Sequence, residues 1–213
     1  MNAWAGTFTA SVGKKVMMAV TGLSFIGFLV MHLLGNLTMY GGGDAFNAYA
    51  EKLHSLGVLL KVAEWGLLAF ALVHVITGGT LVLENFRARP VRYAMKKRAG
   101  GRTLGSATMP YTGVALILFV VFHLINFHFV DKSQTTIFQI VLNAFQSPWY
   151  VAIYVAAMVI AGVHVSHGLW SAFQTLGANH PKYMPLIRIL SVVFAVVVGI
   201  GFGSLPIYIS FVS

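Results

Sequence analysis

The chain contains no cysteine among its 213 residues, and this absence removes several kinds of chemistry. Without cysteine there can be no disulfide, no cysteine-ligated iron–sulfur cluster, no thioether-attached haem and no cysteine nucleophile. Charge is also scarce, since only 9% of the residues are charged, against about 25% in an average soluble domain. Hydrophobic residues make up 58% of the chain, too many for a soluble fold of this size. The composition therefore predicts a protein embedded in a lipid bilayer.

Five apolar runs reach the length of about 20 residues that a membrane-spanning helix needs. They cover residues 16–39, 58–83, 109–129, 149–173 and 186–211. Backbone groups cannot stay unpaired in lipid, so each run is expected to be a helix, and the runs are too continuous for barrel strands. The first run is longer than a signal-peptide core, so we expect it to be retained. The sequence predicts an all-α membrane protein in which residues 1–213 form a single transmembrane domain.

Basic residues are distributed unequally between the two sides of these spans. Eleven of the 14 Lys and Arg residues fall on the side of the N-terminus: Lys14, Lys15, Arg87, Arg89, Arg92, Lys96, Lys97, Arg98, Arg102, Lys182 and Arg188. Only Lys52, Lys61 and Lys132 fall on the other side. Cytoplasmic loops are rich in Lys and Arg, so the N-terminus is expected in the cytoplasm. The net charge of +9 therefore reflects the topology of the chain and is not a sign of nucleic-acid binding. The basic side is also expected to form a docking face for a cytoplasmic partner.

Histidine is frequent for so apolar a chain, and four of the five spans carry it near the middle. An ionisable side chain inside a membrane is costly, so each is a candidate functional residue. Helical rise places His32 and His123 roughly 25 Å and 23 Å from the cytoplasmic edge. The same estimate places His74 at roughly 15 Å, His164 at roughly 13 Å and His167 at roughly 9 Å. Depth therefore favours His164 over His167 and gives two layers about 10 Å apart.

Two pairs of histidines at two depths match the axial ligands of two b haems stacked across a membrane. Haem iron takes its axial ligands from opposite faces of the porphyrin, so the members of a pair should lie on facing helices. We expect His32 with His123 at an outer haem, and His74 with His164 at an inner haem. A structural zinc ion would instead need four ligands together. An isolated intramembrane histidine would form only an interhelical hydrogen bond.

Glycines lie close to the candidate ligands in the sequence. They are Gly35, Gly78, Gly79 and Gly168. Glycine beside a ligand lets a flat macrocycle approach the backbone, but for each glycine taken singly helix packing is the simpler interpretation. Packing is also the expected role of Gly199 and Gly203 in the fifth span.

Several segments of the chain resemble a known family of membrane cytochromes. The segments are residues 11–22, 32–36, 84–90 and 164–177. With the five spans and four placed histidines, the chain resembles, over nearly its whole length, the single-chain dihaem cytochrome b anchor of succinate:quinone oxidoreductases and quinol:fumarate reductases. In that family the ligand of the fourth helix lies four residues before a Gly-Leu-aromatic step, which is the position of His164 here.

The resemblance implies an electron-transfer subunit in the bacterial cytoplasmic membrane, in a succinate dehydrogenase or fumarate reductase complex. A flavoprotein subunit with FAD and an iron–sulfur subunit would dock on its cytoplasmic side, and whole complexes would pair as dimers. The inner haem would exchange electrons with the iron–sulfur subunit, and the outer haem with menaquinone. Four residues near the cytoplasmic edge are candidates to contact haem propionates: Lys15, His167, Ser171 and Gln174.

Quinone reduction needs an acid or base near the headgroup, and the resemblance places the quinone beside the outer haem. The expected outer loop, residues 40–57, contains Glu51 as first candidate for proton transfer and His54 as second. An ordinary solvated loop charge is the alternative for both. Glu64, near the outer end of the second span, either serves the outer pocket or faces interfacial water. Some family members carry a proton-conducting Glu two residues before the fourth-helix ligand; Gly162 stands there, which puts that path in doubt.

Two other functions stay open on the sequence alone. A dihaem cytochrome b of a hydrogenase or formate dehydrogenase would share the haem chemistry but not the fourth-helix motif. A transporter that uses histidine for protons or metal would bind no haem, and would often show an internal repeat. The histidine pattern gives only a faint repeat, and this does not decide between the alternatives.

Overall fold

The computed structural model describes residues 10–88 and 103–212, and these residues form helices and short connections without a strand. Five of the described helices are long and apolar enough to cross a membrane. They are α2 (Ser11–Leu37), α4 (Val58–Arg87), α5 (Leu104–His123), α7 (Pro148–Thr175) and α8 (Met184–Val212). The prediction of an all-α protein with five spans is therefore confirmed. Six basic residues of the expected cytoplasmic loop lie outside the described residues: Arg89, Arg92, Lys96, Lys97, Arg98 and Arg102.

Local capping determines where two of the long helices begin. α5 begins at Leu104, earlier than the predicted residue 109, because Thr103 and Ser106 form a reciprocal capping box. α7 begins with Pro148, a residue suited to the first helical turn because it has no N–H to leave unpaired. Gly177, with a φ of +99°, follows the end of α7, where a residue with a side chain would be strained.

Four shorter elements join the spans. They are the 3₁₀-helical turn η1 (Thr38–Gly41), α3 (Gly42–His54), the π-helical turn η2 (Leu124–His128) and α6 (Ile137–Phe145). The prediction of a loop over residues 40–57 is therefore wrong, because most of this segment is the helix α3. Its apolar residues Phe46 and Ala50 lie one helical turn apart and are both buried, so tertiary packing stabilises the helix.

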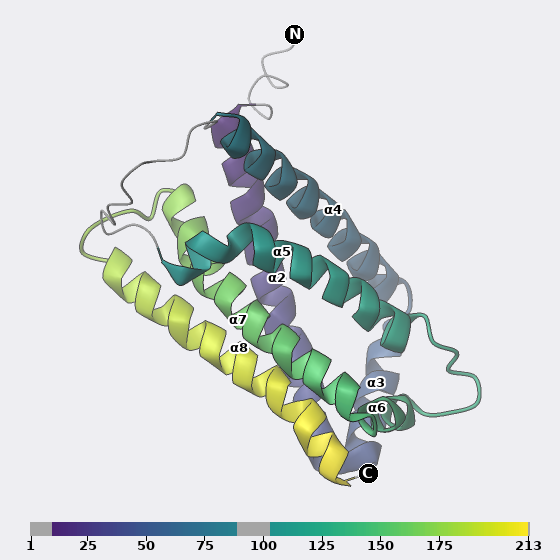
Figure 1. The fold of residues 1–213 in the computed structure, drawn as a ribbon. Coiled ribbons are helices and arrows are strands. Elements are labelled where there is room, and N and C mark those ends of the chain that lie inside the picture. Colours follow the sequence, from purple (N-terminus) through teal and green to yellow (C-terminus); the bar gives the residue numbers. More distant parts are fainter. Residues whose placement is uncertain (1–9, 89–102, 213) are drawn as a thin grey trace.

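The five long helices run between two ends of the bundle (Figure 1). α2 begins at one end, here called the N-terminal end, and α8 finishes at the other, the C-terminal end, where α3 and α6 also lie. α7 contacts α8, α5 and α2, whereas α4 packs mainly on α2 and touches α5 only slightly. The described helices thus pack around α7, which contacts α8 most extensively, while α2 lies against both α4 and α7 and α5 lies against α7.

Glycine allows α8 to approach α7 closely. A Cβ atom added to Gly199 would lie 3.5 Å from the carbonyl oxygen of Met158, and one added to Gly203 would lie 3.7 Å from the Met158 Cβ atom. A Cβ atom at Gly162 would lie 3.3 Å from the carbonyl oxygen of Ala195. The packing role predicted for Gly199 and Gly203 is confirmed, and Gly162 serves the same interface from the other side.

A buried apolar cluster closes the C-terminal end of the bundle. Its members come from η1, α3, α6, α7 and α8: Met39, Phe46, Val141, Phe145, Tyr154, Leu205 and Ile209. The amide N–H of Phe138 donates to Asn47 Oδ1 at 3.0 Å, which ties the start of α6 to α3. The short helices α3 and α6 therefore cover one end of the spans.

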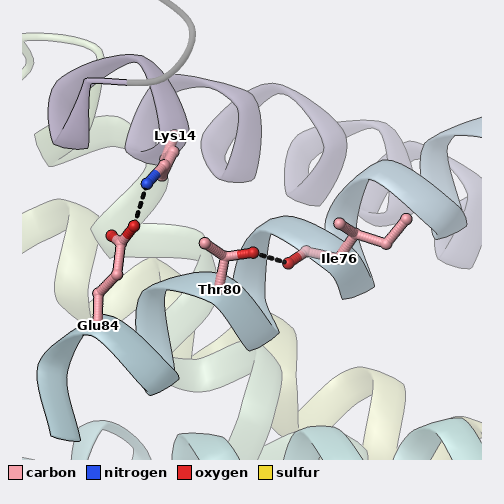
Figure 2. A network of polar contacts seen from close by, with 4 residues as sticks. All are labelled: Lys14, Ile76, Thr80 and Glu84. Atoms are coloured by element: carbon pink, nitrogen blue, oxygen red, sulfur yellow. Dashed lines mark hydrogen bonds and ion pairs between the residues drawn. The ribbon is translucent and has the colours of Figure 1, made fainter. Parts of the chain in front are cut away.

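An ion pair ties α2 to α4 at the N-terminal end of the bundle. Figure 2 shows the ammonium group of Lys14, near the start of α2, against the carboxylate of Glu84, near the end of α4. One turn before Glu84, Thr80 donates its hydroxyl hydrogen to the carbonyl oxygen of Ile76 within α4, at 2.7 Å. The ion pair thus joins the start of the first span to the end of the second, 70 positions apart in the sequence.

Candidate functional site

Two of the candidate histidines face each other across the bundle. His32 lies near the end of α2 and His123 is the last residue of α5, and their ring centroids are 5.9 Å apart with ring planes at 86°. A metal–nitrogen bond to histidine is about 2 Å long, and the ring centre lies about 1 Å beyond the nitrogen. Two histidines that bind one metal ion from opposite sides therefore have ring centroids about 6 Å apart. The ring separation of this outer pair therefore suits two axial ligands of one metal ion.

Aromatic rings surround the outer pair. Phe28, one turn before His32, stacks on its ring with a centroid distance of 5.0 Å, and Phe202 of α8 lies 5.5 Å away. Asn36 donates to the carbonyl oxygen of His32 at 2.8 Å, and its amide nitrogen lies 3.5 Å from His32 Nδ1. His123 Nδ1 lies 3.3 Å from the hydroxyl oxygen of Tyr154 on α7. The outer pair is thus held in an apolar aromatic environment with one polar contact on each Nδ1 side.

The other two candidate ligands form an inner pair, nearer the N-terminal end. His74 lies on α4 and His164 on α7, at similar depths in the bundle. His74 Nδ1 lies 2.9 Å from the hydroxyl oxygen of Thr21 on α2, and His164 Nδ1 lies 3.0 Å from that of Thr112 on α5. Thr21 and Thr112 are among the four buried polar residues of the described chain. Each inner histidine is therefore oriented by a threonine of the helix it packs against.

The threonine hydroxyls also assign the tautomer of the inner histidines. Thr21 donates its single hydrogen to the carbonyl oxygen of Met17 at 2.7 Å, and Thr112 donates to that of Thr108 at 3.1 Å. The hydroxyl oxygens are then left to accept hydrogen bonds from the Nδ1–H groups of His74 and His164. A neutral imidazole protonated on Nδ1 has its lone pair on Nε2, which is the arrangement of a histidine ligand whose orientation is fixed by a neighbouring acceptor.

Glycines of the facing helices leave space beside the inner pair. A Cβ atom at Gly22 of α2 would lie 3.6 Å from His74 Cε1, and one at Gly113 of α5 would lie 3.8 Å from His164 Cε1. A larger side chain at either position would meet the imidazole. The inner histidines thus have small residues across from them on the helix that also supplies their threonine.

The glycines picked out from the sequence have other neighbours. A Cβ atom at Gly35 would clash with the Tyr49 ring of α3, one at Gly78 would contact Met18, and one at Gly168 would lie 4.0 Å from Met109. A Cβ atom at Gly79 would meet nothing within 4 Å. None of these contacts involves a candidate ligand, so helix packing is the role that the structure supports for Gly35 and Gly78.

The remaining candidates near the N-terminal end lie around the end of α7. His167 Nδ1 lies 3.4 Å from the Thr103 hydroxyl oxygen at the start of α5, and the His167 ring packs edge-on against Trp170. His167 thus contacts a neighbouring helix and is not part of the inner pair. The backbone carbonyl of Ser171 accepts the Thr175 hydroxyl hydrogen at 2.9 Å, while Gln174 and Lys15 occupy the same end of the bundle.

The candidates for quinone chemistry lie at the C-terminal end of the bundle. Glu51 is exposed on α3, and His54, the last residue of α3, has its Nδ1 2.7 Å from the Ala50 carbonyl oxygen. Glu64 pairs with Lys61 of the same helix at 2.8 Å. Glu51 and His54 are thus at the same end of the bundle as the outer pair, on a helix and not on a loop.

Several residues around the histidines were not singled out from the sequence. Thr21, Thr112 and Tyr154 provide the polar contacts at Nδ1, and Gly22 and Gly113 provide the space beside the inner pair. Thr21 and Thr112 could have been noticed in the sequence, because they are polar residues inside apolar spans. Their partners could not be assigned without knowing which helices pack together, because each contact joins residues more than 30 positions apart.

Comparisons with known proteins identify no relative, since no family model, curated protein or solved structure matches the chain. The family resemblance therefore stays a prediction based on the sequence motifs. Within the described residues, no three His, Asp or Glu side chains gather to hold a metal ion. The main features of the candidate site are the facing rings of His32 and His123 and the threonine-bound rings of His74 and His164.

Proposed function

We propose that this chain is a membrane cytochrome b that binds two haems and passes electrons between an iron–sulfur subunit and menaquinone, as the anchor of a succinate dehydrogenase or fumarate reductase complex. The observation that carries the proposal is that His32 and His123 face each other with ring centroids 5.9 Å apart, while His74 and His164 lie at a second depth on two other helices. His32 with His123 and His74 with His164 would hold the two haem irons. At His74, His123 and His164 the Nδ1 atom lies beside a hydroxyl oxygen that can accept its hydrogen, which leaves Nε2 to act as ligand.

The side chains around each pair fit a flat, apolar ligand. Phe28 and Phe202 line the outer pair, and Gly22 and Gly113 keep bulk away from the inner pair. Haem supplies a one-electron carrier when it is bound between two such histidines. Contacts within the chain hold the imidazole rings of the four histidines in fixed orientations. Aromatic and aliphatic side chains around them exclude water.

Proton exchange with quinone is assigned to the C-terminal end of the bundle. Conversion of a quinone to a quinol takes two electrons and two protons, so the headgroup must lie within reach of an acid or base. Glu51 and His54 of α3 lie at this end and are the proposed donors, with the outer pair nearby. Gly162 has no side chain that could transfer a proton, so α7 is not assigned a path for protons across the membrane.

The proposal is tested by measuring haem in the purified full-length chain. We expect a reduced-minus-oxidised spectrum of low-spin haem b and, by the pyridine haemochrome assay, about two haems per chain. Substituting any one of the four histidines with alanine should remove one haem. The matched control is His180→Ala, because His180 lies in the connection between α7 and α8. A folded chain without haem, expressed with adequate haem supply, would overturn the proposal and favour a histidine-dependent transporter.

The partner assignment has a separate test. Tagged full-length chain, purified from its native membranes, should bring with it a flavoprotein with FAD and an iron–sulfur protein. Haem in the chain together with a hydrogenase or formate dehydrogenase subunit would retain the cytochrome and reject the succinate–fumarate assignment.

A further inference from the structure

The backbone changes from an α-helix to a π-helical turn immediately after His123. The turn covers Leu124–His128 and is closed by a hydrogen bond of 2.9 Å from the Phe129 N–H to the Leu124 carbonyl oxygen. A π-turn is less favourable than regular helix and is found frequently at functional sites. This one contains no proline that would explain it. The side chains that it directs toward α7 offer a reason.

Asn126 lies in the middle of the π-turn and joins α5 to α7. Its side-chain amide donates to the Phe122 carbonyl oxygen at 2.8 Å, and its Oδ1 accepts a hydrogen bond from the Tyr150 hydroxyl at 3.3 Å. Tyr150 lies one turn before Tyr154 on α7. The π-turn is thus fastened to the same stretch of α7 that contacts His123.

Tyr154 occupies a closed aromatic cage beside His123. Its residue is 6% exposed, and four phenylalanine rings lie with centroids between 5.0 Å and 6.0 Å from its own: Phe119, Phe122, Phe127 and Phe145. Phe127 belongs to the π-turn, so the turn supplies part of the cage. The cage leaves the phenol ring little freedom, and its hydroxyl oxygen lies 3.3 Å from His123 Nδ1.

The chemistry of a histidine ligand gives this contact a direction. When His123 binds iron through Nε2, its Nδ1 carries the proton and becomes the donor, so the Tyr154 oxygen becomes the acceptor. An acceptor at the distal nitrogen increases the electron donation of the imidazole to its metal. Greater donation favours the ferric over the ferrous state.

We propose that Tyr154 is a positioning residue that fixes the ring of His123 and lowers the reduction potential of the outer haem, with the π-turn holding Tyr154 in place through Asn126 and Phe127. This inference rests on the proposed function, since it needs haem at the outer pair. It assigns to the π-turn a role in setting one of the two potentials.

The test is the redox titration of the full-length Tyr154→Phe chain, which keeps the ring in its cage and loses only the hydroxyl. We expect two haems per chain, an unchanged inner potential, and an outer haem whose reduced-to-oxidised ratio at a fixed potential rises about three- to tenfold. Tenfold corresponds to about 59 mV for one electron. The low-spin EPR signal of the outer haem should also shift, because the His123 ring is less constrained.

Tyr40→Phe is the matched control for this titration. Its hydroxyl donates a hydrogen bond to the Ser204 hydroxyl oxygen at 2.7 Å, at the same end of the bundle, and its ring packs against Tyr208 and not against a candidate ligand. We expect both potentials and both EPR signals to stay at their wild-type values in this variant.

Three outcomes separate the two proposals. If the wild-type chain binds no haem, the proposed function and this inference both fail. If Tyr154→Phe binds two haems and leaves the outer potential and EPR signal unchanged, only this inference fails. If Tyr154→Phe does not fold, Asn126→Ala is the second test, because it leaves the aromatic rings of the cage in place. It should raise the outer potential by a smaller amount than Tyr154→Phe. An unchanged outer potential in Asn126→Ala would overturn the inference.

Discussion

Three side-chain oxygens lie at Nδ1 of three of the four candidate ligands, and their chemistry differs between the layers. The inner pair contacts threonines, Thr21 and Thr112, whose own hydrogens are already donated to helix carbonyl oxygens. In the outer pair, His123 contacts a phenol, that of Tyr154. The aliphatic hydroxyls are therefore fixed acceptors, and we expect the two layers to respond separately to substitutions at these positions.

Thr112→Val tests the inner layer at a single residue. Valine keeps the shape of threonine but cannot accept the hydrogen bond from His164 Nδ1–H, so electron donation by His164 should fall and the inner potential should rise. A hydrogen bond contributes about 1 kcal/mol, so the rise should be at most roughly 40 mV for a one-electron couple. Redox titration of the full-length chain measures it. An inner potential that falls, or an outer potential that moves instead, would contradict the tautomer assignment.

Gly22→Leu tests the space beside His74. A Cβ atom at Gly22 meets His74 Cε1 at ordinary contact distance, but the further carbons of leucine would press on the imidazole. We expect loss of the inner haem with retention of the outer one, measured as haem per chain. The control is Gly27→Leu in the same helix, where an added Cβ atom would meet nothing within 4 Å. Equal haem loss in both variants would show that the effect is not local.

At the scale of elements, contacts between neighbouring helices account for how the inner ligands are oriented. α2 packs on α4 and on α7, and α5 packs on α7, while α4 touches α5 only slightly. Thr21 holds His74 across the α2–α4 contact and Thr112 holds His164 across the α5–α7 contact, so each inner ligand is oriented within one helix–helix contact. The outer pair, by contrast, joins α2 to α5 directly.

The ion pair between α2 and α4 is expected to contribute little to stability. The Glu84 side chain is 45% exposed and that of Lys14 is 16% exposed, and partly exposed ion pairs contribute typically less than about 1 kcal/mol. In a double-mutant cycle of Lys14→Gln and Glu84→Gln, we expect a coupling that shifts thermal unfolding by no more than about 2–4 °C. The coupling measured for the exposed Lys61–Glu64 ion pair within α4 provides a comparison. A much larger coupling would mean that the pair is shielded from solvent.

Sequence reasoning succeeded for features that one helix determines by itself. The five long apolar helices follow from apolar run length. It failed for α3, because residues 40–57 contain too few consecutive apolar residues to signal a helix that is stabilised by packing on neighbours. It also failed for the Tyr154 contact, because nothing local reveals that α7 faces His123 at that level.

At the scale of the whole molecule, the structure separates two ends of different character. The N-terminal end carries five of the described basic residues, Lys14, Lys15, Arg87, Lys182 and Arg188, whereas the C-terminal end, covered by α3 and α6, carries Lys52, Lys61 and Lys132. The outer pair lies toward the covered end and the inner pair toward the basic end. With the basic end toward the cytoplasm, a cytoplasmic partner would approach the inner pair and a quinone at the opposite surface would approach the outer pair.

Thiol labelling tests this orientation directly, because the chain has no cysteine and every label reports an introduced one. The exposed positions Ser55 and Ser133 lie at the C-terminal end, and the exposed positions Ala88 and Ala178 lie at the N-terminal end. Since Lys and Arg are retained on the cytoplasmic side, Ser55→Cys and Ser133→Cys should react with a membrane-impermeant reagent in intact cells. Ala88→Cys and Ala178→Cys should react only after the membrane is permeabilised. The reverse pattern would place α3 and α6 in the cytoplasm, and would then require the iron–sulfur partner to approach the outer pair and the quinone to approach the inner one.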